Sequence, residues 1–203
     1  MKKIIGVFIL LLMSITFWAQ SRNATYDAYI EQYRHIAIEQ QRLHGIPAAI
    51  TMAQAILESA AGKSELATQA NNHFGIKCTS DWPGRTYHYN GDRTNECFRH
   101  YATAQDSYED HSLFLKRKRY ESLFALSIGD YKNWAYGLKN CGYATDPNYP
   151  EKLIRLIELY ELNRLTFDQS LVRSDAVNSK TIHLDDDSTD VHFIEQDTSS
   201  HSP

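Results

Sequence analysis

The sequence is poor in cysteine and has no excess of basic residues. Its 203 residues include 3 cysteines, too few for a small protein held together mainly by disulfides. Its formal net charge of -4 differs from the basic charge typical of dedicated nucleic-acid-binding proteins, so no nucleic-acid partner is expected. Because 42% of the residues are hydrophobic, the chain can form a core, and disorder along its whole length is excluded.

The acidic charge is concentrated near the C-terminus. Residues 168–203 carry eight acidic side chains against two basic ones, a charge of -6, whereas residues 21–167 carry 17 of each and are neutral. The apolar periodicity also ends after Phe167. The sequence therefore predicts one domain over residues 20–167 and a disordered acidic tail over residues 168–203.

No apolar run is long enough for an ordinary membrane-spanning helix. Lys2 and Lys3 precede an apolar run over Ile4–Met13, and a processing point follows Ala19. Only about 15 residues separate Lys3 from Trp18, whereas a helix needs roughly 20 to cross a bilayer. Residues 1–19 are predicted to be a signal peptide, with an uncleaved anchor as the alternative. We expect an exported protein with no stable membrane span after signal removal.

Export would allow the cysteines to pair, because disulfides persist in oxidising compartments. A bridge between Cys78 and Cys97 would close a loop of about 20 residues and stabilise the fold by roughly 3 kcal/mol, leaving Cys141 as a buried or free thiol. The alternative is a zinc site that combines these two cysteines with His73 and His88. The sequence contains no C-x-x-C or H-x-x-x-H pair, so we expect no metal, and nothing indicates another cofactor.

Two helices are predicted at the start of the domain. Apolar residues recur at helical spacing from Tyr26 to Leu43, and His44-Gly45 ends that run. A second helix is expected from Pro47 to Gly62. Its core face would be formed by Ile50, Ala53, Ile56, Leu57 and Ala60, and another face by Thr51, Gln54, Ala55 and Glu58.

Glu58 is the first candidate for chemistry. Most glutamates lie on solvent-facing surfaces, and this is the simplest interpretation. However, Glu58 has no basic residue four positions away, and its neighbours are apolar or small, so burial would raise its pKa. A carboxyl group with a raised pKa can protonate a leaving oxygen near neutral pH.

A small β-sheet is predicted in the middle of the domain. Ile76–Cys78 and Arg85–Tyr89 are typical of short strands, Asn90-Gly91 predicts a hairpin turn, and Thr94–Tyr101 predicts the return strand. Glu96 lies on the return strand. It is either an exposed strand residue or a second carboxylate facing Glu58, as glycoside hydrolysis requires.

Helices are expected again after the sheet. Thr103 and Asp106 resemble the capping box of a helix that continues through Leu115. Asp130 would cap a helix that runs toward Asn140 and stops at Gly142. The last helix opens at Pro150, with a core face formed by Leu153, Leu156, Ile157 and Tyr160.

Two polar segments offer further candidates. Tyr143, Asp146 and Tyr149 lie in a loop between two helices, where Gly, Asp-Pro and Asn are also ordinary turn residues. Tyrosines in such a loop are suited to stacking on sugar faces. Asn71 and Asn72 offer amide groups, although they also fit a helix end followed by a tight turn.

Four segments occur together in the order of a known family: Ala53-Gln54-Ala55-Ile56-Leu57-Glu58-Ser59, Gly62-Lys63-Ser64, Asn71-Asn72-His73-Phe74-Gly75-Ile76-Lys77 and Gly142-Tyr143-Ala144-Thr145-Asp146-Pro147-Asn148-Tyr149. Through them, the region from Tyr26 to Leu165 resembles the exported glucosaminidases of glycoside hydrolase family 73. These include the peptidoglycan-hydrolase domain of flagellar rod proteins.

The resemblance implies a mainly helical α+β, lysozyme-like fold, with a helical lobe and a small β-hairpin lobe flanking a glycan cleft. The glutamate of the family's A-x-L-E-S helix matches Glu58, which implies that Glu58 is the catalytic acid. The family's second catalytic carboxylate lies in the β lobe, and Glu96 is the candidate for it here. In some relatives the outgoing strand of the hairpin carries that carboxylate, but Thr86–Tyr89 contains no acidic residue. The tyrosine of the G-Y-A-T-D motif matches Tyr143, a third catalytic candidate. Candidate substrate-binding residues are Gln54, Asn71, Asn72, Phe74, Asp146 and Tyr149.

The implied activity is hydrolysis of the β-1,4 bond between N-acetylglucosamine and N-acetylmuramic acid in peptidoglycan, as in an autolysin. We expect a monomer whose partner is the glycan strand, located in the periplasm or secreted and associated with the cell wall. The alternatives are a muramidase or lytic transglycosylase acting on the same polymer, or a non-catalytic glycan-binding module.

Overall fold

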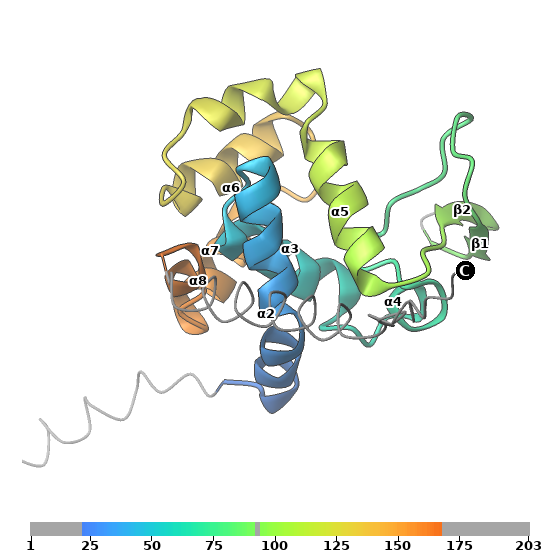
Figure 1. The fold of residues 1–203 in the computed structure, drawn as a ribbon, viewed down its shortest axis with the longest axis horizontal. Coiled ribbons are helices and arrows are strands. Elements are labelled where there is room, and N and C mark those ends of the chain that lie inside the picture. The colour runs from blue at the N-terminus through green and yellow to red at the C-terminus, as the bar shows by residue number, and fades with distance from the viewer. Residues whose placement is uncertain (1–21, 92–93, 168–203) are drawn as a thin grey trace, which may run out of the picture. The chain divides into compact units, whose positions relative to one another are not determined.

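The computed structural model describes residues 22–91 and 94–167 (Figure 1). The predicted signal peptide and acidic tail lie outside these residues. The mainly helical α+β class is confirmed, with one two-stranded sheet among the described residues. The elements are α2 (Ala24–His44), α3 (Ala48–Ser59), α4 (Glu65–Ala70), β1 (Thr86–Tyr89), β2 (Glu96–Arg99), α5 (Ala104–Leu115), the 3-10 helix η2 (Lys118–Ala125), α6 (Tyr131–Asn140), α7 (Tyr149–Leu159) and α8 (Asn163–Phe167).

The first predicted helix is confirmed as α2, and its ends follow from the sequence. The Asn23 side chain accepts a hydrogen bond from the Thr25 N–H and thereby caps the first turn. Gly45 ends the helix at a φ of 72°, a left-handed conformation that glycine adopts without the penalty of a Cβ atom.

The second predicted helix, α3, is buried on nearly all sides. Thr51, Gln54 and Ala55 are as fully buried as Ile50 and Ile56, although the sequence placed them on different faces. The reason is that α2, α6, α7 and α8 all pack against α3. Glu58 lies in the last turn of α3, after the fully buried part of the helix.

The predicted end of this helix at Gly62 is wrong, because α3 ends at Ser59. Ala60 and Ala61 adopt left-handed conformations with φ of 50° and 52°. The Ser59 hydroxyl accepts a hydrogen bond from the Gly62 N–H at 2.7 Å and closes the turn that follows. As a result Ala60, expected on the core face, is exposed.

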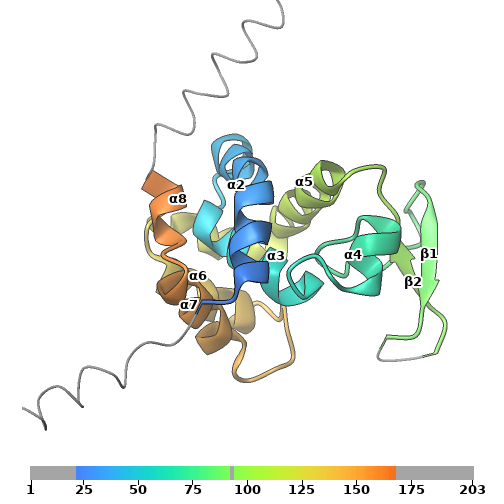
Figure 2. The ribbon, with the colours of Figure 1, turned by 90° about the horizontal axis from the view of Figure 1, so that it is seen from below.

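The predicted hairpin is confirmed, but its turn is longer than expected. Tyr89 pairs with Glu96, so residues 90–95 connect the strands instead of the two-residue turn that Asn90-Gly91 predicts. The Asn90 side chain accepts a hydrogen bond from the Asn95 N–H across this wider loop. The expected strand Ile76–Cys78 is reduced to a single bridge between Lys77 and Phe98. Figure 2 shows the hairpin at one end of the described part, beside α4.

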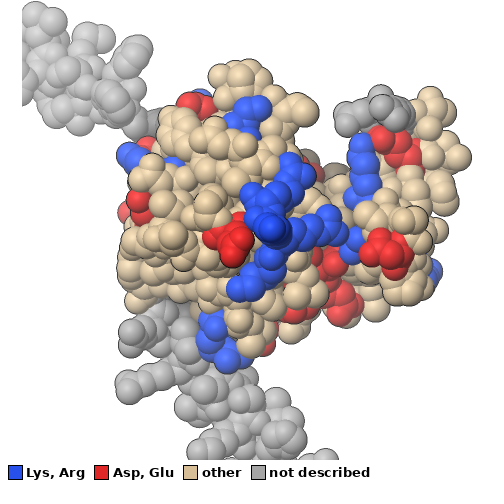
Figure 3. Space-filling view, turned by 90° about the horizontal axis from the view of Figure 1, so that it is seen from above, with Lys and Arg blue, Asp and Glu red and all other residues tan. Residues whose placement is uncertain are grey.

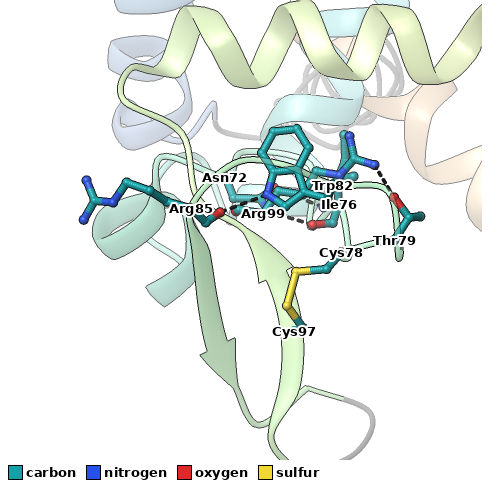
Figure 4. Close-up of a disulfide and its surroundings, with 8 residues drawn as sticks. All are labelled: Asn72, Ile76, Cys78, Thr79, Trp82, Arg85, Cys97 and Arg99. Carbon is teal, nitrogen blue, oxygen red and sulfur yellow. Dashed lines mark hydrogen bonds between the residues drawn. A yellow bond between two sulfur atoms is a disulfide. The ribbon is translucent and has the colours of Figure 1, made fainter.

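The predicted disulfide between Cys78 and Cys97 is confirmed, with the two Cα atoms 5.4 Å apart (Figure 4). It joins β2 to the segment that follows α4. Backbone hydrogen bonds on both sides of the bridge, from Cys78 N to Cys97 O and from Arg99 N to Ile76 O, hold the same two segments together. Cys141 is a free thiol.

The later helices are confirmed as α5, α6 and α7. Thr103 and Asp106 form the reciprocal capping box at the start of α5, and Asp130 caps α6. In α7 the expected core residues Leu153 and Ile157 are buried, and Tyr160 is buried just beyond it. The short elements α4, η2 and α8 have too few turns to produce the apolar repeat from which helices are predicted.

The helices in the described ranges include none that is long and apolar enough to cross a membrane.

Candidate active site

A cleft of about 620 Å³ opens beside the last turn of α3. Its walls come from the end of α3, the segment that follows α4, the region where α5 ends and η2 begins, and the loop between α6 and α7. The lining residues are Leu57, Glu58, Phe74, Gly75, Ile76, Lys77, Cys78, Thr79, Arg99, Phe114, Arg117, Tyr143, Ala144, Thr145, Asp146, Tyr149 and Lys152.

Glu58 lines this cleft in a largely desolvated position. Burial raises the pKa of its carboxyl group, and the hydrogen bond from Tyr149 opposes that rise in part. The position near the C-terminal end of α3 also disfavours a negative charge, because the helix dipole is negative there. Glu58 makes no ion pair within residues 22–91 and 94–167, so its protonated form is favoured as the sequence predicts.

Tyr149 and Gln54 lie behind Glu58 and orient it. The Tyr149 hydroxyl donates to Glu58 Oε1 at 2.9 Å and accepts a hydrogen bond from Gln54 Nε2 at 3.1 Å. Gln54 stands one helical turn before Glu58, so both side chains leave α3 on the same side. Tyr149 is 3% exposed and Gln54 is fully buried, and only Tyr149 lines the cleft. These two residues, expected to bind substrate, therefore hold the Glu58 carboxyl group through hydrogen bonds.

Tyr143 lines the cleft beside this pair. Its ring stacks on that of Tyr149, with centroids 5.6 Å apart. Desolvation and the nearby charge of Glu58 raise the pKa of the Tyr143 hydroxyl, so it stays protonated and can donate a hydrogen bond. The structure thus brings together Tyr143 and Glu58, which lie far apart in the sequence.

Two cations hold the loop that carries Tyr143. The Arg119 guanidinium donates to the carbonyl oxygens of Cys141 and Gly142, and Lys139 Nζ donates to those of Ala144 and Thr145. Arg119 approaches so closely that a Cβ atom at position 142 would lie 2.5 Å from it. Gly142 also has a φ of 73°, which favours glycine on backbone grounds.

Asp146 lines the cleft but already has partners. One carboxylate oxygen accepts a hydrogen bond from the Asn148 N–H, and the other pairs with Lys152 Nζ at 2.6 Å. The hydrogen bond from Lys152 is the main reason that the pKa of this carboxyl group is lowered. Asp146 therefore stays ionised and contributes to the structure of the loop as well as to the cleft wall.

Phe74, Asn71 and Asn72 differ in their access to the cleft. Phe74 lines it, and its ring stacks on His111 with centroids 3.9 Å apart. Asn72 is buried and uses both ends of its amide on the backbone of Ile76 and Arg99. Asn71 bonds to the carbonyl oxygens of residues 101 and 102 and does not line the cleft. Of these three expected substrate-binding residues, only Phe74 faces the cleft.

Glu96 is not among the residues that line the cleft. Its carboxylate pairs with Lys77 Nζ at 2.7 Å, and Lys77 lines the cleft whereas Glu96 does not. The hairpin thus brings Glu96 near the cleft without placing it opposite Glu58 in the lining. In the described part of the chain, the carboxylates that line the cleft are those of Glu58 and Asp146.

The sequence did not reveal a polar network that joins the hairpin to α5. Arg99 Nη1 donates to both carboxylate oxygens of Asp110, and the Tyr101 hydroxyl also donates to Asp110. The Arg99 guanidinium lies over the Trp82 ring, 4.3 Å from its centroid (Figure 4). Arg99 and Tyr101 both lie in the predicted return strand, but nothing in the sequence identified their shared partner on a distant helix.

The alternative zinc site lacks its two cysteine ligands. Cys78 and Cys97 are bonded to each other, so neither offers a thiolate. His73 Nδ1 already lies 2.7 Å from the Tyr29 hydroxyl. No group of three potential metal ligands occurs in the described ranges.

Known proteins resemble this chain in sequence and in fold. The family model "Mannosyl-glycoprotein endo-beta-N-acetylglucosaminidase" (Glucosaminidase) matches residues 34–162. The exo-glucosaminidase LytG of Bacillus subtilis (strain 168) is 38% identical over 143 residues, which cover 64% of this chain and 49% of that protein. The peptidoglycan hydrolase FlgJ of Vibrio parahaemolyticus is 27% identical over 147 residues, covering 66% of this chain and 47% of that protein. The chain thus spans about half the length of these curated relatives.

Solved structures show the same architecture. A peptidoglycan hydrolase from Sphingomonas sp. A1 superposes with a TM-score of 0.60 at 29% identity, covering 68% of this chain and 91% of that one. The catalytic domain of the autolysin Auto from Listeria monocytogenes superposes with a TM-score of 0.61 at 24% identity, covering 77% of this chain and 96% of that one. Because the family model spans most of the described residues, including those of the cleft, the chain belongs to the glucosaminidase family.

Proposed function

We propose that the chain is a peptidoglycan hydrolase that cleaves the β-1,4 bond between N-acetylglucosamine and N-acetylmuramic acid, with Glu58 as the general acid. The observation that carries this proposal is the position of Glu58. Its carboxyl group lines the cleft, its pKa is raised by burial, and Tyr149 holds one of its oxygens. Membership of the glucosaminidase family and the names of the relatives support the same activity.

Proton transfer follows from the arrangement around Glu58. Oε1 accepts the hydrogen bond from Tyr149, so the acidic proton is carried by Oε2 and is available to the glycosidic oxygen. Donation to that oxygen lets the bond to the anomeric carbon break through an oxocarbenium-like transition state. Tyr143 is the proposed third member of the site, because its protonated hydroxyl can donate a hydrogen bond to the sugar beside the acid.

Glu96 is the proposed second carboxylate, which would activate water or stabilise the transition state. In the structure its carboxylate is bonded to Lys77, so this role requires Glu96 to exchange that partner for water or substrate. Participation of the substrate's own 2-acetamido group is the competing route. The absence of Glu96 from the cleft lining favours that route, because it needs no second carboxylate.

The cleft also supports a direct contact with the glycan. Tyr143, Phe74 and Asp146 line it and are the proposed substrate-binding surface, while Gln54 and Tyr149 act through Glu58. A substrate in the cell wall requires an exported enzyme, periplasmic or secreted, which agrees with the predicted signal peptide over residues 1–19. We propose that it acts as a monomer, with the acidic residues 168–203 outside the catalytic domain.

The decisive experiment is to digest purified peptidoglycan and identify the new reducing ends. Reducing N-acetylglucosamine supports the proposal, whereas reducing N-acetylmuramic acid would show a muramidase. An anhydro N-acetylmuramic acid end, which has no free reducing group, would show a lytic transglycosylase. A zymogram separates an enzyme from a glycan-binding module, since a module would bind without clearing. Product length separates endo cleavage, which gives mixed fragments, from exo cleavage of the kind named for the Bacillus subtilis relative.

A further inference from the structure

The cleft carries more positive than negative side chains. Four cationic residues line it, Lys77, Arg99, Arg117 and Lys152, against two acidic ones, Glu58 and Asp146. Binding a neutral polysaccharide does not require an excess of positive charge. Whether this charge can bind a ligand depends on which of the four cations already pair with protein carboxylates.

Three of the four cations are neutralised by protein carboxylates. The pairs are Lys77 with Glu96 at 2.7 Å, Arg99 with Asp110 at 2.9 Å and Lys152 with Asp146 at 2.6 Å. Each nitrogen lies within hydrogen-bond distance of its carboxylate oxygen. These three cations therefore form ion pairs within the protein and stabilise the cleft walls.

Arg117 differs from the other three. Within the described ranges it forms no ion pair with a carboxylate, and its side chain is exposed. Its guanidinium carbon lies 4.4 Å from the centroid of the Phe114 ring, and both residues line the cleft. Stacking on an aromatic ring restrains a guanidinium group while leaving its N–H edges free to donate two parallel hydrogen bonds to a carboxylate.

The surroundings of Arg117 reinforce its charge. It belongs to a run of four exposed cations, Lys116–Arg119, where α5 gives way to η2. Figure 3 looks onto this side of the molecule and shows Lys and Arg gathered beside the hollow that separates its larger part from its smaller part. Two of the other three cations are used elsewhere: Lys116 donates to the His44 carbonyl, and Arg119 holds the loop before Tyr143.

The field of Arg117 also reaches the opposite wall of the cleft. The pKa of Asp81 is lowered mainly by its hydrogen bond with Thr79, and the charges of Arg99 and Arg117 add to this effect. Thr79 lines the cleft on the side of the hairpin. Asp81 therefore lies within the field of Arg117 without forming an ion pair with it, and in the described part of the chain no carboxylate is bonded to the Arg117 guanidinium.

We propose that Arg117 is a specificity-determining residue that binds a carboxylate carried by the glycan strand in the cleft. This inference rests on the proposed function and deepens it, because it names the chemical group that distinguishes the substrate from a neutral polymer. Two sources supply that group in peptidoglycan. One is the lactyl carboxylate of N-acetylmuramic acid, which is free only when no peptide is attached, and the other is the set of carboxylates on the stem peptide.

Binding by a catalytically disabled chain tests the proposal. In a full-length Glu58→Gln background, we would measure the affinity for three soluble oligosaccharides of equal length by calorimetry. These are a neutral N-acetylglucosamine oligomer, an alternating N-acetylglucosamine–N-acetylmuramic acid oligomer without peptides, and the same oligomer with stem peptides. Arg117→Ala is compared with Lys118→Ala, which removes the same charge one residue away and does not line the cleft.

We expect Arg117→Ala to weaken binding of a carboxylate-bearing oligomer about five- to tenfold, with the neutral oligomer and Lys118→Ala unaffected. A loss already present without peptides identifies the lactyl carboxylate, and a loss confined to the peptide-bearing oligomer identifies the stem. Equal losses on all three oligomers, or no loss on any, would overturn the proposal. Cleavage of peptidoglycan by the wild-type chain is scored separately, so the proposed hydrolysis can fail while this site stands.

Discussion

The hydroxyl of Tyr149 lies 2.9 Å from Glu58 Oε1 and donates a hydrogen bond to it. This bond opposes the effect of burial, because it stabilises the ionised carboxylate while desolvation stabilises the neutral acid. The pKa of Glu58 is therefore raised less than burial alone would raise it. Tyr149 is in turn held by Gln54, so two side chains fix the environment of the Glu58 carboxyl group.

Tyr149→Phe should move the alkaline limb of the pH–rate profile to higher pH. Without the hydrogen bond, the charged form of Glu58 loses support and its pKa rises further, so the acid keeps its proton to higher pH. The measurement is kcat/KM against pH for the wild type and the variant. An alkaline limb that stays in place, or moves down, would show that this limb does not report Glu58.

Glu58→Gln should lose about 10²- to 10⁴-fold in kcat while the fold is retained, because the amide cannot donate the acid's proton. Its stability should also change with pH in a defined direction. A carboxyl group whose pKa is raised by folding opposes folding as the pH rises above its unfolded value, and this penalty is absent below that value. Glu58→Gln should therefore gain stability relative to the wild type at pH 8 and not at pH 3. Denaturant unfolding at both pH values tests this, and wild-type turnover by the variant would remove Glu58 from the mechanism.

Glu96→Gln separates the two routes for the second step. If Glu96 activates water, its loss in kcat should be comparable to that of Glu58→Gln. If the substrate's acetamido group participates instead, the loss should stay below about tenfold, since the variant then mainly weakens the pair with Lys77. Lys77→Met serves as the control, because it breaks the same pair while leaving the carboxylate in place.

Arg119→Met should lower kcat about tenfold with little change in the free energy of unfolding. The side chain is exposed, but its hydrogen bonds to Cys141 and Gly142 hold the loop that carries Tyr143. Steady-state kinetics and denaturant unfolding are compared with those of Lys118→Met, an exposed neighbour. Parallel losses of kcat in the two variants would show a general charge effect, and partial rescue by Arg119→Lys would support the hydrogen-bonding role.

Removal of the disulfide should cost about 3 kcal/mol of unfolding free energy, since the bridge closes a loop between residues separated by 19 positions. The measurement is urea unfolding of the Cys78→Ser/Cys97→Ser double variant. Cys141→Ser, which removes the free thiol, should leave stability within about 0.5 kcal/mol of the wild type. A double variant as stable as the wild type would mean that the backbone hydrogen bonds beside the bridge suffice.

The parts that could be predicted from the sequence are those encoded by neighbouring residues. Periodicity and capping residues located α2, α3, α5, α6 and α7, and the apolar neighbours of Glu58 correctly indicated that its pKa would be raised. The ends of α3 and of the hairpin turn were missed because side chains closed each turn, namely Ser59 and Asn90.

The site itself was only partly predictable. Tyr149 was identified as a loop tyrosine suited to sugar. In the structure the residue is 3% exposed, lies at the start of α7, and its hydroxyl donates to Glu58. Arg99 and Asp110 meet through the packing of a strand on a helix, and the periodicity of neither element specifies such a partner. Interactions between distant elements therefore account for most of what the sequence left undetermined.

The burial of α3 from Ala48 to Ile56 also restricts how this site can evolve. A helix on the surface tolerates substitutions on its solvent side, so changes can accumulate there with a period of 3.6 residues. From Ala48 to Ile56, α3 has no such side, and every position is enclosed by other helices. New specificities are therefore more accessible through the exposed walls of the cleft, where Arg117 lies, than through the helix that carries Glu58.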